Sequence, residues 1–248
     1  MQWINVEIQQ RFPGKISIGK SMRNNPWVTK DVGAGGAGFN AQWDAEFVPP
    51  IRQAVISRDD KLRDAGAVSK AIEHRYDSDA FKRVIYTESH DEIANGRARV
   101  PEEIWPGKVD SWFSKKRSTL GAAIVLTSPG IPMIFQGQEL LEDRWFQDKD
   151  PIDWSRIAGE NGILSMYRDL IALRRNLSGL TRGLCGQNIH IYHVDNEAKV
   201  IAFHRWDKQG PTDSVVVVVN MMNQNRDGYV IGFPRAGLWK TRFNSDSY

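Results

Sequence analysis

The segment Ile85-Tyr86-Thr87-Glu88-Ser89-His90-Asp91-Glu92 joins an apolar, β-prone start to a polar and ionisable end. Residues 84–87 predict a short buried strand that stops abruptly at this polar cluster. Polar side chains gathered where a buried strand ends are typical of a site on an α/β scaffold. A solvated loop after a strand explains a single cluster of this kind equally well.

Two other segments repeat the same layout. Residues 131–135 lead into Gln136-Gly137-Gln138-Glu139, and residues 15–18 lead to Lys20. Because parallel strands carry their carboxyl ends to one edge of a sheet, three such segments predict one shared pocket.

The composition limits the class of protein. A chain of 248 residues can bury a large core, as one barrel or as two smaller domains. No stretch approaches the roughly 18 uncharged residues of a membrane helix, and no secretory leader is visible, so a membrane partner is not expected. The formal charge of +3 is spread along the chain without a basic block, which argues against nucleic acid as a partner.

Cysteine and histidine usage bears on redox state and metals. Cys185 is the single cysteine, so no internal disulfide can form. This usage predicts a reducing compartment, the cytoplasm or an organelle such as a plastid. No Cys/His cluster with metal-ligand spacing occurs, so neither a metal nor another cofactor is expected.

Aromatic side chains are unusually frequent, with nine tryptophans among them. Trp27, Trp43 and Trp145 fall beside proline, glycine or charged residues. Most loop tryptophans fill small satellite cores, but a flat ring beside a pocket also suits the face of a sugar. Trp27 and Trp43 are therefore candidate substrate contacts.

The first 180 residues alternate between strand-like and helix-like patterns. A glycine-rich segment, residues 33–38, lacks the Gly-Lys-Ser/Thr ending of a phosphate-binding loop and predicts a flexible turn. Further strands are expected at 15–18, 39–44, 84–87 and 131–135, helices at 3–8, 51–55, 111–125 and 162–176, an exposed helix at 65–75, and a loop at 94–107.

After Gly179 the pattern becomes β-rich, with turns between the runs and no helical period. We therefore predict a small antiparallel all-β domain at residues 181–248, cut short at its end, after an α/β domain at residues 1–180. Strands are expected at 189–194, 200–206, 214–220, 229–233 and 239–243. An eight-unit barrel needs on the order of 250 residues, so the α/β part is expected to be half of one.

The segment from Tyr86 to Glu92 resembles the strand-seven motif of the α-amylase family, glycoside hydrolase family thirteen. Its Ser-His-Asp-Glu form is similar to that of α-1,4-glucan branching enzymes. Residues 130–139 resemble the strand-eight segment, and the helix at 167–176 and the β domain are also similar. The resemblance covers nearly all of the chain. It implies the C-terminal half of a (β/α)8 barrel followed by a small antiparallel β-sandwich.

The resemblance also assigns roles to individual residues. It implies that His90 and Asp91 hold the sugar under attack, with Asp91 as the stabiliser of the transition state. Charged groups bonded to sugar hydroxyls can bind an oxocarbenium-like state more tightly than the ground state. Ser89 and Glu92 are expected to support this contact. Gln138 and Glu139 are expected at the lip, as ligands of the substrate or as anchors of the loop.

Two departures from the family pattern bear on catalysis. The retaining mechanism needs two carboxylates roughly 5–5.5 Å apart. The family's nucleophilic Asp ends strand four, and no segment of this chain matches that motif. The family's acid/base Glu ends strand five, and Lys20 stands at this position. A cationic lysine is a poor proton donor and repels a cationic transition state.

The expected function is that of an α-1,4-glucan-active enzyme, most similar to a branching enzyme of glycogen or starch metabolism, present as a fragment that is inactive alone. The expected partner is an α-glucan polysaccharide or oligosaccharide, and the uncovered half-barrel predicts self-association. A non-catalytic glucan-binding protein is the alternative. A Schiff-base enzyme that uses Lys20 is a more remote one.

Overall fold

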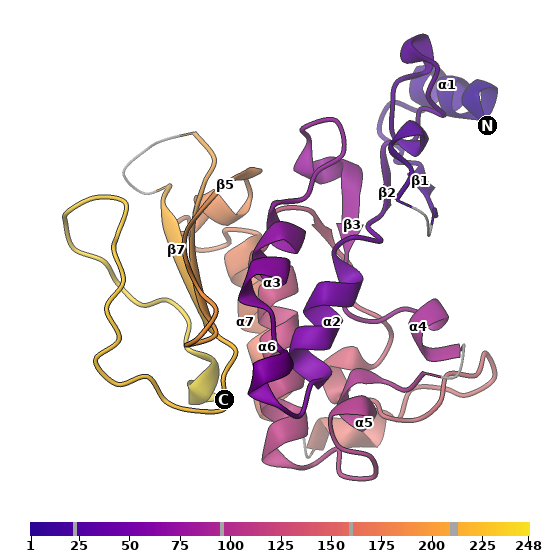
Figure 1. The fold of residues 1–248 in the computed structure, drawn as a ribbon. Coiled ribbons are helices and arrows are strands. Elements are labelled where there is room, and N and C mark those ends of the chain that lie inside the picture. Colours follow the sequence, from indigo (N-terminus) through magenta and orange to yellow (C-terminus); the bar gives the residue numbers. More distant parts are fainter. Residues whose placement is uncertain (22–23, 95–96, 159–160, 209–212) are drawn as a thin grey trace.

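The computed structural model describes residues 1–21, 24–94, 97–158, 161–208 and 213–248, and Figure 1 shows how they are arranged. Its first sheet has four strands in the order β1 (Ile18–Gly19), β2 (Ala41–Trp43), β3 (Arg83–Ile85) and β4 (Ile131–Pro132). All three strand pairs are parallel. Consecutive parallel strands require crossover connections, and helices supply those between β2 and β4.

The helices follow the strands along the chain. The helix α1 (Gln2–Arg11) precedes β1, and α2 (Val48–Ile56) and α3 (Ala65–Glu73) connect β2 to β3. Between β3 and β4 the chain forms α4 (His90–Ala94), α5 (Val100–Ile104) and α6 (Trp112–Thr127), and α7 (Asn161–Arg174) follows β4. Local signals start several of these helices. The side chain of Asp64 accepts a hydrogen bond from Ala67 N at the start of α3, and Ser111 caps α6 in the same way.

The second sheet is antiparallel, with the order β5 (Asn188–Asp195), β6 (Val200–Trp206) and β7 (Val215–Asn220). The prediction of an α/β part followed by an antiparallel all-β part is therefore confirmed. Figure 1 shows α2, α3 and α6 between β3 and the β5–β7 sheet. One apolar cluster joins both sheets through these helices, with Ile51, Ile85, Ile124, Ile201 and Phe203 among its fully buried members.

Three local predictions were wrong. The predicted exposed helix is α3, and its Ala65, Val68, Ala71 and Ile72 are buried because it packs between the two sheets. The predicted loop at 94–107 contains α5, and its residues 95–96 lie outside the described part of the chain. Residues 229–233 and 239–243 are not strands. In the described chain neither segment is paired in a sheet: Tyr229 contacts His193 and Asp195 of β5 through its side chain, and Val230 remains 85% exposed.

Buried arginines organise the turn between α6 and β4. Arg205 of β6 donates to Thr127 O, Arg174 of α7 to Ser128 O and Gly130 O, and Arg83 of β3 to Pro129 O. All four carbonyls of residues 127–130 are thus satisfied by cationic donors from three other elements. Gly130 adopts a φ of +141°, which an L side chain rarely tolerates, where the chain turns into β4.

No helix within the described part of the chain is long and apolar enough to cross a membrane.

Candidate functional site

The carboxyl ends of the parallel strands bring four side chains together. Lys20 follows β1, Trp43 ends β2, and His90 and Asp91 open α4 just beyond β3. The Lys20 ammonium lies 2.5 Å from Asp91 Oδ2, 3.3 Å from His90 Nε2 and 5.2 Å from the centre of the Trp43 ring. We call Lys20, Trp43, His90 and Asp91 the strand-tip cluster. It contains two of the three polar strand ends for which one shared pocket was predicted, and the third, after β4, lies outside it.

The cluster is open to solvent but internally connected. The side chain of His90 is 47% exposed and that of Asp91 is 23% exposed. His90 Nε2 lies 3.4 Å from Asp91 Oδ1, and the His90 ring meets Trp43 edge to face at 5.7 Å between centroids. An ammonium, an imidazole, a carboxylate and an indole therefore share one surface. Together they offer donors, an acceptor and a flat apolar face, as a sugar requires.

Ser89 and Glu92 lie beneath this surface. Both are buried, and the Ser89 hydroxyl is hydrogen-bonded to the Glu92 carboxylate. Ser89 Oγ also accepts a hydrogen bond from Asp91 N at 3.2 Å. These bonds hold the backbone of Asp91, so the geometry favours a supporting role for the two residues over direct contact with a ligand.

A buried ion pair, which the sequence reasoning missed, ties β3 to the segment after β4. Glu88 is fully buried, accepts from Val100 N at 2.5 Å and lies 3.4 Å from Arg99 Nη1. Burial raises the pKa of Glu88 above its ordinary value, although the charge of Arg99 opposes that shift. Arg99 also donates to Gln136 O at 2.9 Å. The segments that follow β3 and β4 are thereby held in a fixed position relative to each other.

Gln138 and Glu139 begin the short 3-10 helix Gln138–Leu140 after β4. Gln138 Nε2 donates to Thr87 Oγ1 at 2.6 Å, and Gln138 Oε1 accepts from Phe135 N at 3.2 Å. Both polar ends of this side chain are thus bonded within the protein. One carboxylate oxygen of Glu139 is buried. This geometry favours anchoring of the loop, while a role in substrate binding remains a prediction.

The tryptophans that the sequence singled out as possible sugar contacts lie at different places in the structure. Trp43 belongs to the strand-tip cluster and also packs edge to face against Tyr86, 5.2 Å away. Trp27 lies in the 3-10 helix Pro26–Val28, half exposed, with the Lys30 ammonium 4.2 Å above its ring. Among the described residues, no ring contact or hydrogen bond joins Trp27 to the strand-tip cluster. Trp145 is exposed and lines a small cavity beside Gln136 and Arg144.

Asp44 is a second residue that the sequence reasoning missed. It directly follows β2 and is fully buried, with Oδ2 at 3.1 Å from Arg83 Nη1 and 3.0 Å from His74 Nδ1. Its place after the strand ending at Trp43 is the same signal that identified His90. Since Asp44 is fully buried and held by Arg83 and His74, it braces β2 against β3 and does not reach the open surface.

In the described part of the chain, no group of three or more His, Cys, Asp or Glu side chains could hold a metal ion.

A parallel sheet with polar strand tips, followed by an antiparallel sheet, is the arrangement that the resemblance to the α-amylase family implies. Residues 190–248 match the family model of the alpha amylase C-terminal all-beta domain. Solved structures share the fold of nearly all of the chain. The type III pullulan hydrolase from Thermococcus kodakarensis matches with a TM-score of 0.65 and 22% identity, covering 89% of this chain and 36% of that one. A pullulanase from Anoxybacillus sp. LM18-11, solved with maltotetraose, matches with a TM-score of 0.64 and 20% identity, covering 90% and 36%.

Among curated proteins, the chain is similar to bacterial 1,4-alpha-glucan branching enzymes. It is 27% identical to GlgB 2 of Xanthomonas oryzae pv. oryzae over 100% of this chain and 34% of that protein. It is 28% identical to GlgB of Rhodospirillum rubrum over 98% of this chain and 33% of that protein. The predicted resemblance to the α-amylase family, with branching enzymes among the similar proteins, is confirmed. The chain spans about a third of the length of these relatives.

Proposed function

We propose that the protein binds α-1,4-glucan chains at the strand-tip cluster, as part of glucan chemistry of the branching-enzyme type. The observation that carries this proposal is the convergence of Lys20, His90 and Asp91 on one another beside the Trp43 ring. A carboxylate accepts from sugar hydroxyls, an ammonium or imidazole donates to them, and an indole can stack on the apolar face of a ring. The similarity to branching enzymes supports an α-glucan as the ligand.

We further propose that the 248-residue chain alone neither cleaves nor transfers glucan. A retaining enzyme uses two carboxylates roughly 5–5.5 Å apart, and the strand-tip cluster contains one, Asp91. The Lys20 ammonium lies 2.5 Å from it. A cation at this distance competes for the carboxylate with a developing positive charge on the sugar, and it disfavours that charge directly. Binding and turnover are therefore separable properties of this chain.

Binding is tested by calorimetric titration of the chain with maltoheptaose. Asp91→Asn keeps the shape of the side chain and removes its charge, so we expect about 10- to 100-fold weaker binding. The matched control is Asp227→Asn, because Asp227 is exposed and lies outside the cluster. Equal affinity of both variants and the unaltered chain contradicts the proposal.

Turnover is tested with amylose, by iodine absorbance for branching and by reducing-end release for hydrolysis. We expect neither signal above the protein-free rate, both with Lys20 and with Lys20→Glu, because that substitution restores one carboxylate and leaves the second position unfilled. Measurable turnover by the unaltered chain overturns the second part of the proposal and leaves the first intact.

The Schiff-base alternative for Lys20 gains no support from this geometry. An amine must be free of its proton to attack a carbonyl, and Lys20 is held as an ion pair with Asp91 at 2.5 Å. Borohydride trapping with a carbonyl compound is expected to leave Lys20 unmodified, as judged by peptide mass analysis. A stable adduct on Lys20 contradicts this.

A further inference from the structure

A groove of about 610 Å³ runs between α6 and β7, and the segment 243–246 closes one of its sides. Figure 1 shows α4, which carries His90 and Asp91, on the opposite side of α2 and α6 from β7. The groove is therefore separate from the strand-tip cluster. Its volume lies within the range of roughly 300–1,000 Å³ that small-molecule sites occupy.

The floor of the groove is apolar. One side of α6 contributes Trp112, Leu120 and Ile124, whose spacing of four and eight residues keeps them on one helix face. Val217 and Val219 of β7 contribute the facing wall. Trp112 opens α6 and is 58% exposed, so its ring lies at one end of this stripe. An exposed indole beside an apolar floor can stack on the ring face of a sugar.

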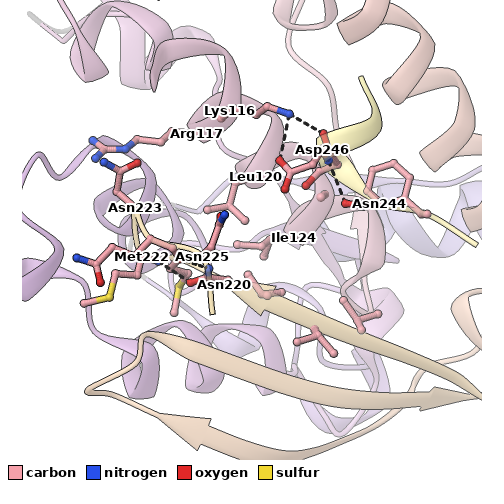
Figure 2. A pocket seen from close by; sticks show the side chains of 18 of the residues that line it. Lys116, Arg117, Leu120, Ile124, Asn220, Met222, Asn223, Asn225, Asn244 and Asp246 are labelled. Carbon is pink, nitrogen blue, oxygen red and sulfur yellow. Dashed lines mark hydrogen bonds and ion pairs between the residues drawn. The ribbon is translucent and has the colours of Figure 1, made fainter. Parts of the chain in front are cut away.

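The rim of the groove is built from amide side chains. Figure 2 shows Asn223 and Asn225 on the turn after β7, across from the Leu120 face of α6. Gln224 lies between them. In the described part of the chain, none of these three side chains is hydrogen-bonded to another residue. Each amide offers two donors and an acceptor, the combination that pairs with adjacent hydroxyl groups, which both donate and accept.

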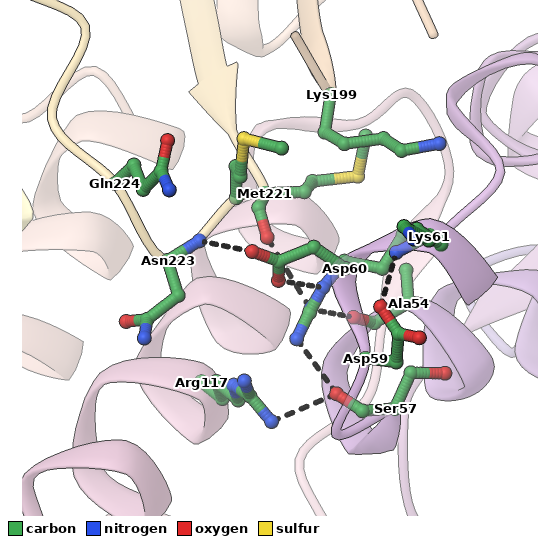
Figure 3. A network of polar contacts seen from close by, with 12 residues as sticks. Ala54, Ser57, Asp59, Asp60, Lys61, Arg117, Lys199, Met221, Asn223 and Gln224 are labelled. Carbon is green, nitrogen blue, oxygen red and sulfur yellow. Dashed lines mark hydrogen bonds and ion pairs between the residues drawn. The ribbon is translucent and has the colours of Figure 1, made fainter. Parts of the chain in front are cut away.

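Several hydrogen bonds, three of them exposed and one buried, hold this rim in place. Asn220 Oδ1 accepts from Met222 N at 3.0 Å, and Asn220 Nδ2 donates to Gln224 O at 2.8 Å. Asn223 N donates to Asp60 Oδ2 at 3.1 Å, one of the contacts drawn in Figure 3. The fully buried Arg63 binds Met221 O at 3.3 Å. A rim ordered in advance loses less conformational entropy when a ligand binds.

The charges that face the groove are already engaged. Figure 2 shows Lys116 bonded to the segment 243–246: its ammonium lies 3.2 Å from Asp246 Oδ1 and donates to Ser245 O at 2.9 Å. Arg117 donates to Ser57 O at 2.8 Å. The amides and the apolar floor remain as the recognition surface. This composition suits a neutral, polyhydroxylated ligand better than an anion.

From these features we propose that the α6–β7 groove is a second carbohydrate site that takes a neutral oligosaccharide, with Trp112 as the stacking platform and Asn223 and Asn225 as hydroxyl partners. The choice of a linear α-glucan as the oligosaccharide rests on the proposed function. A glucan bound in this groove and at the strand-tip cluster at the same time contacts the protein on two faces. Binding in the groove then raises the effective concentration of glucan at the strand-tip cluster.

The experiment follows maltoheptaose binding by two-dimensional amide NMR of the full chain, with the indole signal of Trp112 assigned through Trp112→Phe. We expect shifts at Trp112 and at residues 223–225, in addition to shifts at the strand-tip cluster. Asn223→Ala combined with Asn225→Ala is expected to weaken the groove shifts at least about tenfold, and Trp112→Ala to do the same. Their matched controls on the exposed face of α1, Gln10→Ala and Trp3→Ala, are expected to change neither set.

The two proposals fail separately in this design. Shifts that persist in the groove when Asp91→Asn abolishes those at the strand tips support the second site. Shifts confined to the strand tips overturn the second site and leave the proposed function standing. Shifts confined to the groove support the second site and overturn the proposed binding of glucan at the strand-tip cluster. Shifts of residues 223–225 caused by inorganic phosphate and not by maltoheptaose identify an anion site, and they overturn the second-site proposal.

Discussion

Lys20 has an ammonium 2.5 Å from Asp91 and a side chain that is 40% exposed. Partly exposed ion pairs of this kind contribute only about 0–1 kcal/mol to stability. Hydroxyl groups of a bound sugar can therefore replace the contact at low cost. The pair orients the Asp91 carboxylate, and under the proposed function it favours holding a glucan chain over stabilising a cationic state.

Asp44 provides a test at the level of one side chain. Burial by itself raises the pKa of Asp44, but the hydrogen bond with His74 and the charge of Arg83 outweigh burial and hold that pKa below its ordinary 3.8. A lowered folded-state pKa adds stability above the unfolded-state pKa, and that stability is lost as the pH falls through the folded value. Asp44→Asn leaves Arg83 without its carboxylate, so we expect the free energy of unfolding to fall by about 3–5 kcal/mol near neutral pH.

Urea unfolding followed by circular dichroism, repeated from neutral pH down to about pH 3, measures this effect. The difference between Asp44→Asn and the unaltered chain should begin to shrink below about pH 4, where the unfolded state starts to bind a proton at Asp44, and should shrink further as the folded-state carboxylate is protonated at lower pH. The exposed Asp227→Asn should stay within about 0.5 kcal/mol of the unaltered chain at each pH. A difference that does not depend on pH contradicts the assigned charge of Asp44.

The turn at 127–130 depends on three elements that lie far apart in the sequence. Burial, followed by the nearby charges of Arg174 and Arg83, lowers the pKa of Arg205 well below its ordinary value. Hydrogen bonds to backbone carbonyls offset the free-energy cost of burying several arginines close together. Besides Thr127 O, Arg205 donates to Leu184 O and Gly186 O. This turn joins the second sheet to the crossover between α6 and β4. Arg205 is thus a structural link between the two sheets.

Arg205→Met tests that link. Methionine keeps much of the volume but donates no hydrogen bond, so several buried carbonyls lose their partners, and we expect a loss of about 3 kcal/mol or more in the free energy of unfolding. The control is Arg182→Met, because Arg182 is 52% exposed and paired with Asp207 at 2.8 Å. That change should cost about 0–1 kcal/mol. Equal urea midpoints for the two variants would show that the buried cluster contributes nothing specific.

The molecule as a whole combines a shared core with open sheet edges. The cluster that contains Ile72, Ile85, Phe203 and Val219 extends across residue 180, so the two predicted domains bury apolar surface against each other. β1 and β4 are the outer strands of the parallel sheet in the described chain. Near β1, Ile16 is 68% exposed and Ile18 is 46% exposed. Exposed strand edges with apolar side chains favour pairing with another chain.

We therefore expect the 248-residue chain to self-associate as its concentration rises, as measured by sedimentation velocity over a dilution series. Ile16→Lys together with Ile18→Lys places charge at the β1 edge and should shift the distribution towards monomer. Ile4→Lys is a matched control on α1, where Ile4 is also 46% exposed. A chain that stays monomeric at every concentration, or one whose association responds equally to both sets of changes, contradicts this edge as the contact.

The sequence alone determined the type and order of most elements and the location of the polar strand tips. Local periodicity and end signals were sufficient for β3, for α6 and α7, and for the three strands of the second sheet. These features depend on near neighbours in the chain. The motif from Tyr86 to Glu92 also carried the family resemblance, which the comparisons confirmed.

Only the tertiary structure decided which of these elements found partners. Residues 229–233 have a strand pattern but are paired in neither sheet of the described chain, while α3 is buried because two sheets enclose it. The contacts of Lys20 with Asp91, and of Arg205 with Thr127, join residues that are 71 and 78 positions apart. Such contacts depend on where distant segments meet, and no local pattern specifies that.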